Sequence, residues 1–169
     1  NFVVSASSLL KHLKSISGVL NTNNSIPILD CFLFELNKNE LTMSASDMET
    51  TITTSIKIDS TSTGSIAIPA KTLMEALANL PEQPISFIVD KTKHSVKLKT
   101  ETGDYNISGQ NGDEYPKMPK LDSQSSIVIK SDVLFNAINK TIFATGSDDL
   151  RPVMSGVYCQ FTETNSIFV

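Results

Sequence analysis

The sequence predicts an α+β protein in which a short strand leads into a helix three times. These strand-to-helix segments begin at Phe2, Ile66 and Ile127. In each segment apolar residues first alternate, as in a strand, and then recur three or four positions apart, as on one helix face. Further strand-like runs lie between and after the helices. The high strand content beside three helices favours the α+β class.

The first segment joins a strand at Phe2 and Val4 to a helix expected over Ser7–Ser17. One face of this helix carries Leu9, Leu13 and Ile16, and the opposite face carries Ser7, Lys11 and Lys14. The polar face is either an ordinary solvated surface or a basic contact surface. Pro27 then opens an apolar run, Ile28–Leu36, which is expected to be a strand.

The other two segments repeat this order. A helix expected over Lys71–Leu80 is followed by three strand candidates, at Ile85–Val89, Ser95–Lys99 and Tyr105–Ser108. A helix expected over Asp132–Ile142 is followed by Pro152, which opens the apolar run Val153–Phe161, and by a last strand at Ser166–Val169. Cys31 and Cys159 fall in apolar runs, where cysteine is usually a small buried side chain.

The spacing of the segments predicts the domain organisation. They begin 64 and 61 residues apart, which is wider than the roughly 20 to 50 residues of a solenoid repeat and suits half-domains. We expect one complete domain over residues 1–120, with halves of about 1–62 and 63–120. The proline- and serine-rich stretch Asp113–Ser126 predicts a connector, with the linker proper at 121–126. Residues 127–169 would be the first half of a second domain, continued in a longer protein.

Charge is unevenly distributed along the sequence. The chain has a formal charge of -4, which argues against a protein that is basic all over. The three expected helices nevertheless carry a formal charge of +2, from Lys11, Lys14, Lys71 and Lys140 against Glu75 and Asp132. There is no signal peptide, membrane-length apolar run or disulfide pattern, so the cytoplasm is the expected compartment.

No set of residues in the sequence suggests catalysis. His12 and His94 lack cysteine or carboxylate neighbours at metal-ligand spacing, so neither a metal nor a cofactor is expected. His12 is expected at a helix edge or facing phosphate. Asp47 and Glu49 could act as paired acids in a hydrolase, but solvation or turn capping explains them better. The hydrolase and a scaffold with no nucleic-acid role stay open as alternatives.

Four segments, taken together, resemble the bacterial DNA polymerase III beta subunit family, the replicative sliding clamps. They are Ser25–Leu29, Ser46–Glu49, Asp113–Pro119 and Phe143–Gly156. The resemblance runs along the whole chain in order, over the first of three similar domains and the opening half of the second. It implies the DNA clamp fold, in which each domain has two strand-helix-strands halves with helices on one face and antiparallel sheets on the other. It also implies a non-catalytic accessory subunit of a DNA-directed DNA polymerase.

The resemblance further implies a head-to-tail homodimeric ring around duplex DNA, without membrane contact. The candidate DNA-binding residues are Lys11, Lys14, Asn23, Lys71 and Lys140. Asn23 stands where family members carry an arginine, so hydrogen bonding is retained and long-range attraction is lost. Asp148 stands where the family uses a neutral polar contact, and its charge opposes that role.

Two protein-binding surfaces are also implied by the resemblance. Tyr105 and Ile107, flanked by Asp104, match the strand that meets the neighbouring subunit. Arg151, Pro152 and Met154 match one wall of the pocket that holds clamp-binding peptides. The implied partners are the polymerase III catalytic subunit, the clamp loader and other proteins with clamp-binding motifs.

Overall fold

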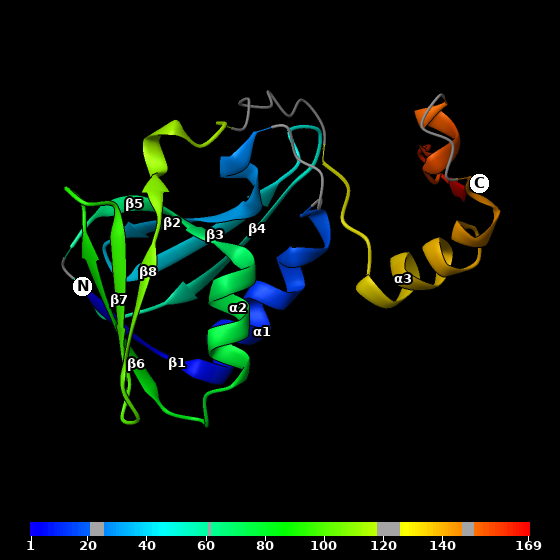
Figure 1. Ribbon diagram of the computed structural model, residues 1–169. Coiled ribbons are helices and arrows are strands. Elements are labelled where there is room, and N and C mark those ends of the chain that lie inside the picture. The colour runs from blue at the N-terminus through cyan, green and yellow to red at the C-terminus, as the bar shows by residue number, and fades with distance from the viewer. Residues whose placement is uncertain (21–25, 61, 118–125, 147–150) are drawn as a thin grey trace. The chain divides into compact units, whose positions relative to one another are not determined.

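The computed structural model describes residues 1–20, 26–60, 62–117, 126–146 and 151–169 (Figure 1). The chain divides into two compact units, residues 1–119 and 120–169, and each is described by itself. Asn23, Asp148 and residues 121–125 of the expected linker lie outside the described residues.

Within its described residues, the first unit contains two α-helices and nine strands. In chain order these are β1 (Phe2–Ser5), α1 (Ala6–Ile16), β2 (Cys31–Asn37), β3 (Glu40–Ser46), β4 (Thr51–Lys57), β5 (Gly64–Pro69), α2 (Ala70–Ala78), β6 (Pro84–Asp90), β7 (Ser95–Lys99), β8 (Asp104–Ser108) and β9 (Gln110–Asn111). Three 3-10 turns accompany them: η1 (Ser17–Val19), η2 (Pro27–Asp30) and η3 (Gly112–Glu114). The α+β class is confirmed.

The second unit contains α3 (Ser131–Asn139), the 3-10 turns η4 (Ile142–Ala144) and η5 (Pro152–Ser155), and a hairpin of β10 (Cys159–Phe161) and β11 (Ser166–Phe168). None of its described residues is buried. Large apolar side chains such as Phe143 and Val153 are 82% and 90% exposed. Cys159 is exposed too, whereas Cys31 of the first unit is buried as expected.

The three expected helices are confirmed with small shifts. Each begins one residue earlier than expected and ends one to three residues earlier. The apolar runs after Pro27 and Pro152 are only partly strands, because each begins with a 3-10 turn that has proline near its start. The fixed φ of proline favours the first position of such a turn over a place in a strand ladder. The strands therefore begin later, at Cys31 and Cys159.

The two expected halves of the first unit exchange their leading strands. One sheet has the order β1-β6-β7-β8 and the other the order β4-β3-β2-β5-β9, and all pairs are antiparallel. Thus β1, from the first half, pairs with β6, with Phe2 opposite Phe87. In return β5, from the second half, pairs with β2, with Ile68 opposite Phe32. Neither half has a sheet of its own, so the unit is a single folded body.

One core lies between the helices and the inner faces of both sheets. Helix α1 contributes Leu9, Leu13 and Ile16, and α2 contributes Leu73 and Leu77, all at most 2% exposed. The sheets contribute alternate strand residues, among them Phe32, Met43, Phe87 and Leu98. Figure 1 shows α1 and α2 next to each other on one side of the unit, and the two helices are in contact.

A second, smaller core lies around Tyr115. This side chain is 3% exposed, packs with Ile28, Leu29, Cys31 and Ala67, and donates a hydrogen bond to the Cys31 carbonyl at 3.3 Å. The expected connector from Asp113 onward is therefore wrong for its first residues, since Asp113–Tyr115 belong to the fold of the first unit. The burial of Tyr115 thus fixes residues 113–115 to the first unit, although this stretch has no apolar periodicity.

Candidate nucleic-acid interface

The start of α1 is held by its own serine cap and by a carboxylate from the second half of the unit. Ser5 caps the helix, its Oγ accepting from the Ser8 amide at 3.2 Å. The Glu82 carboxylate accepts hydrogen bonds from Ser5 Oγ at 2.7 Å and from the Ser7 amide at 3.2 Å. Hydrogen bonds from Ser7 and then Ser5 lower the pKa of Glu82. A negative charge at the N-terminus of a helix also suits the helix dipole. These contacts fix the direction of α1 and hence of its polar face.

Three lysines project from the two adjacent helices of the first unit. Lys11 and Lys14 on α1 and Lys71 on α2 are exposed. Within the described residues, no carboxylate lies within 4.0 Å of these ammonium groups. Lysine ammonium groups without an intramolecular partner are available to phosphate oxygens.

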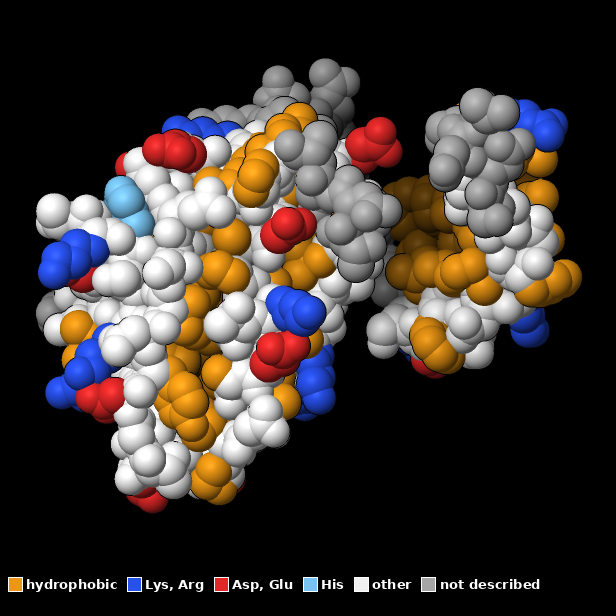
Figure 2. All heavy atoms as spheres, in the orientation of Figure 1, with side chains coloured by type: hydrophobic (Ala, Val, Ile, Leu, Met, Phe, Trp, Pro, Cys, Tyr) orange, Lys and Arg blue, Asp and Glu red, His pale blue; other side chains and the backbone are white. Residues whose placement is uncertain are grey.

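The helix face is not uniformly basic. Glu75 lies one turn after Lys71 on α2, and it too is exposed. Figure 2, in the same orientation as Figure 1, shows lysine and acidic side chains close together on this unit, with apolar side chains between them. Such a surface attracts phosphate weakly, which suits non-specific contact better than a tight, fixed complex.

His12 lies at the edge of α1 and contacts the sheet. Its Nδ1 is 2.7 Å from Thr54 Oγ1 on β4, and both residues are half-buried. Of the two roles expected for His12, the structure therefore favours the helix edge over a phosphate-facing position. The contact ties α1 to β4.

The remaining expected DNA contact within the described residues lies in the second unit. Lys140 is exposed at the C-terminal cap of α3, where its amide donates to the carbonyl of Asn136 at 3.1 Å. A lysine at this position suits the negative end of the helix dipole.

The expected subunit-contact strand, β8, is the outer strand of its sheet. The Gly109 amide donates to the His94 carbonyl, and the Thr100 amide donates to the Gly103 carbonyl. Together with the strand register, these bonds show which residues of β8 form hydrogen bonds to β7 and which do not. The backbone groups of Asp104, Asn106 and Ser108 therefore point away from β7. Among the described strands, none pairs with this outer edge.

The side chains of β8 differ in availability. Tyr105 is 40% exposed, but Ile107 is only 5% exposed and packs in the core of its own unit. Asp104 forms an ion pair with Lys97, with Oδ2 2.7 Å from Nζ, and hydrogen bonding to Lys97 lowers the pKa of Asp104. Sequence reasoning missed Lys97, which lies across the ladder from β8. A contact through this edge would use the backbone of β8 and the side chain of Tyr105. Ile107 would pack beneath them in the core.

The expected peptide-pocket residues lie at η5, with Arg151 just before the turn and Pro152 and Met154 within it. Arg151 and Met154 are exposed, and the Met154 amide donates to the Arg151 carbonyl at 2.9 Å. The Met154 carbonyl in turn accepts from the Gly146 amide at 2.8 Å. Pro152 lies between them in the chain, at the start of the turn.

Asp47 and Glu49 lie on the turn between β3 and β4. The Asp47 Oδ1 atom accepts from the amides of Glu49 at 3.1 Å and Thr50 at 2.7 Å, which closes the turn between β3 and β4. Glu49 is exposed on that turn, where Met48 has a φ of 80°. Among the described residues, no three histidine, cysteine or acidic side chains form a group that could hold a metal ion. The turn-capping interpretation is confirmed.

Comparisons with known proteins agree with the clamp resemblance. Residues 1–119 match the family model described as DNA polymerase III beta subunit, N-terminal domain. A beta sliding clamp from Halalkalibacterium halodurans is 26% identical over 165 residues, which are 93% of this chain and 43% of that protein. The chain therefore spans less than half the length of this curated relative.

Solved structures show the same fold. The crystal structure of the DNA polymerase sliding clamp from Bacillus subtilis has a TM-score of 0.91 at 22% identity, over 99% of this chain and 46% of that one. The corresponding structure from Caulobacter crescentus has a TM-score of 0.85 at 26% identity, over 94% of this chain and 43% of that one. None of the helices within the described residues is long and apolar enough to cross a membrane.

Proposed function

This chain belongs to the DNA polymerase III beta subunit family through its first 119 residues, and from that premise we propose that it is part of a replicative sliding clamp. The whole protein would surround duplex DNA as a ring and tether the polymerase, without catalysing a reaction itself. A role on the bacterial chromosome would place it in the cytoplasm.

The observation that carries this proposal is the pair of adjacent helices whose lysines have no carboxylate partner among the residues that the structure describes. Lys11, Lys14 and Lys71 are exposed on α1 and α2 in a chain whose formal charge is -4. Such a distribution attracts phosphates to the helices and repels them elsewhere. Lysine contacts to phosphate carry no base readout, so they leave a ring free to move along DNA. Lys140 and Asn23 are further proposed contacts in the same role.

The proposed ring needs a subunit contact, and the outer edge of β8 supports one. An antiparallel sheet with an unpaired edge can be extended by a strand from another chain. We place Tyr105, Asp104 and the backbone of β8 at a head-to-tail homodimer contact, with Ile107 behind them. This assignment rests on the family and on the free edge.

The second unit supplies the proposed contact to partner proteins. Arg151, Pro152 and Met154 would form one wall of a pocket for clamp-binding peptides of the polymerase catalytic subunit, the clamp loader and other partners. In this proposal residues 1–120 are a complete clamp domain, 121–126 a linker, and 127–169 the first half of a second domain. The compact units at 1–119 and 120–169 support the division.

The proposal is tested by charge reversal in the whole protein. We expect Lys11→Glu combined with Lys14→Glu to lower the processivity of the polymerase on primed DNA. The logarithmic salt dependence of direct DNA binding should also become shallower by about 0.9 for each lysine that no longer binds a phosphate. Lys93→Glu, an exposed lysine in the turn between β6 and β7, is the matched control and should change neither quantity. Unchanged processivity in the double variant would favour a scaffold without a nucleic-acid role.

A further inference from the structure

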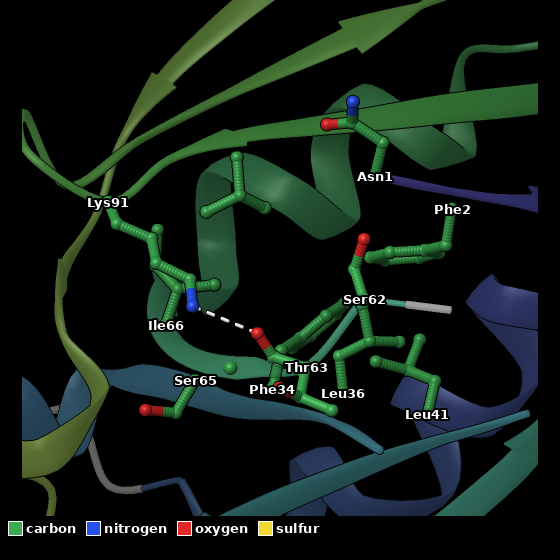
Figure 3. Close-up of a pocket in the computed structure, with 12 residues that line it drawn as sticks. Asn1, Phe2, Phe34, Leu36, Leu41, Ser62, Thr63, Ser65, Ile66 and Lys91 are labelled. Carbon is green, nitrogen blue, oxygen red and sulfur yellow. Dashed lines mark hydrogen bonds between the residues drawn. The ribbon is translucent and has the colours of Figure 1, made fainter. Parts of the chain in front are cut away.

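An apolar cavity of about 400 Å³ lies between the two sheets of the first unit (Figure 3). Its apolar wall is formed by Phe2, Phe34, Leu36, Leu41, Ile66 and Val89, from β1, β2, β3, β5 and β6. Four of these, Phe2, Phe34, Leu41 and Ile66, are at most 5% exposed and belong to the core. The volume lies within the range of about 300 to 1,000 Å³ that is typical of small-molecule sites.

Lys91 supplies a positive charge at this cavity. Its Nζ donates a hydrogen bond to the Thr63 carbonyl at 2.9 Å, as Figure 3 shows. Within the described residues no carboxylate lies within 4.0 Å of this ammonium group. An ammonium group has three donors. The contact to Thr63 therefore orients the side chain and leaves two N–H donors for another group.

The position of Lys91 depends on Gly64. A Cβ atom at Gly64 would lie 2.5 Å from Lys91 Nζ and 2.7 Å from its Cε, so the absence of a side chain lets the lysine lie over this residue. Gly64 also has a φ of +149°, which L side chains rarely adopt. The backbone conformation therefore favours glycine at residue 64, and a side chain there would require the end of Lys91 to move.

The same lysine borders a polar hollow of about 250 Å³. That hollow is lined by Ser65, His94, Asn111 and Asp113 in addition to Lys91. The Asp113 carboxylate accepts a hydrogen bond from Ser65 Oγ at 3.1 Å. Lys91 therefore stands at the boundary between an apolar space and a polar one. The single positive charge of Lys91 at this boundary suits a group with a single negative charge on the apolar side, away from Asp113.

We propose that this cavity binds a small monocarboxylate with an apolar body. The apolar body would lie against Phe34, Ile66 and Val89, and the carboxylate would accept hydrogen bonds from Lys91 Nζ. This site is separate from the proposed DNA and subunit contacts, and it does not depend on them. Its occupant is defined by charge complementarity to Lys91 and by the apolar wall behind that charge.

The test uses sodium decanoate below its micelle-forming concentration and, as the uncharged counterpart, decanol. Binding to the intact chain is followed by methyl NMR. We expect saturable shifts at the methyl groups of Leu36, Leu41 and Val89 with decanoate, and binding of decanol about tenfold weaker, since a hydrogen bond to a charged group is lost.

Lys91→Met should weaken decanoate binding about tenfold and leave decanol binding unchanged. The variant should fold, since Lys91 is exposed. Lys93→Met, two residues along the same turn, is the matched control and should bind decanoate like the parent chain. Equal binding of decanoate and decanol, or no effect of Lys91→Met, would overturn the proposal. So would shifts confined to the exposed apolar residues of the second unit, such as Val153 and Ile167.

Discussion

Phe2 of β1 stacks on Phe87 of β6, with ring centroids 4.8 Å apart and ring planes at 9°. The two residues are also direct partners in the strand register. Phe2 belongs to the first half of the unit and Phe87 to the second. This pair therefore joins the two halves through the exchanged strand, and it lies in the main core.

Replacement of Phe2 by alanine should destabilise the first unit strongly. We expect the free energy of unfolding in urea to fall by about 3 to 5 kcal/mol, because a buried aromatic side chain leaves a cavity. Val3→Ala is the matched control, since Val3 is on the same strand but 54% exposed, and its effect should stay within about 0.5 kcal/mol. Equal effects of the two variants would mean that β1 does not hold the halves together.

Gly112 and Gly18 should respond in opposite ways to alanine. A Cβ atom at Gly112 would lie 2.6 Å from Ser65 Cβ and 2.7 Å from the Ile66 amide nitrogen, so backbone must move. We expect Gly112→Ala to lower the free energy of unfolding by about 1 to 3 kcal/mol. A Cβ atom at Gly18 meets nothing within 4 Å, so Gly18→Ala should be neutral or slightly stabilising. Thermal unfolding of both variants distinguishes them, and a neutral Gly112→Ala would contradict the close packing of η3 on β5.

Asp47 should matter for folding through its hydrogen bonds alone. Asp47→Ala removes the acceptor for two backbone amides and should cost about 1 to 2 kcal/mol in the free energy of unfolding. Asp47→Asn keeps a side-chain oxygen and should cost less, and Glu49→Ala should be near neutral. In the whole protein, none of these changes should abolish polymerase processivity. Loss of function in the stably folded Asp47→Asn variant would instead support a chemical role for the carboxylate.

The two cysteines should differ in reactivity. Burial, and then the charge of Asp30, raises the pKa of the Cys31 thiol from 9.0 to about 11. Iodoacetamide should therefore modify the exposed Cys159 in the native chain and leave Cys31 unmodified until urea unfolds it. Mass spectrometry of the alkylated peptides measures both. Rapid native alkylation of Cys31 would contradict its burial.

The same pKa shift predicts a pH dependence of stability. The folded chain keeps the Cys31 proton above pH 9.0, where the unfolded chain loses it, so the folded state binds more protons between about pH 9 and 11. The free energy of unfolding therefore keeps this contribution in full below about pH 9 and loses it as the pH rises from about 9 to 11. Cys31→Ala should remove this part of the alkaline decline, which urea unfolding at several pH values would measure. An identical decline in both proteins would assign it to other groups.

Sequence patterns predicted the local elements well, because local spacing decides them. The stripe Leu9, Leu13 and Ile16 identified α1, and the alternation in Ser95–Lys99 gave β7 with its observed bounds. The pairing of β1 with β6 could not be predicted in this way, because it joins Phe2 to a residue far along the chain. Strands β3 and β4, rich in serine and threonine, were likewise not identified as a pair.

In the candidate site, too, the features that depend on local spacing were predicted, and those that depend on tertiary packing were not. The lysines of α1 and α2 were predicted from helical spacing and are exposed on adjacent helices. The burial of Ile107 and Tyr115 was not predicted, because it depends on which elements pack over them. The anchoring of α1 by Glu82 depends on a tertiary contact as well, although the Ser5 cap has a local signal in the serine just before the helix.

The central claim is that the whole protein holds DNA by enclosing it, and topology tests this most directly. The whole protein should be loaded on a nicked circular plasmid by its clamp loader, and retention measured before and after a single cut that linearises the DNA. We predict retention on the circle and loss from the linear form, because the lysine contacts are too weak to hold the ring once an end is available. Equal retention on both forms would contradict the account.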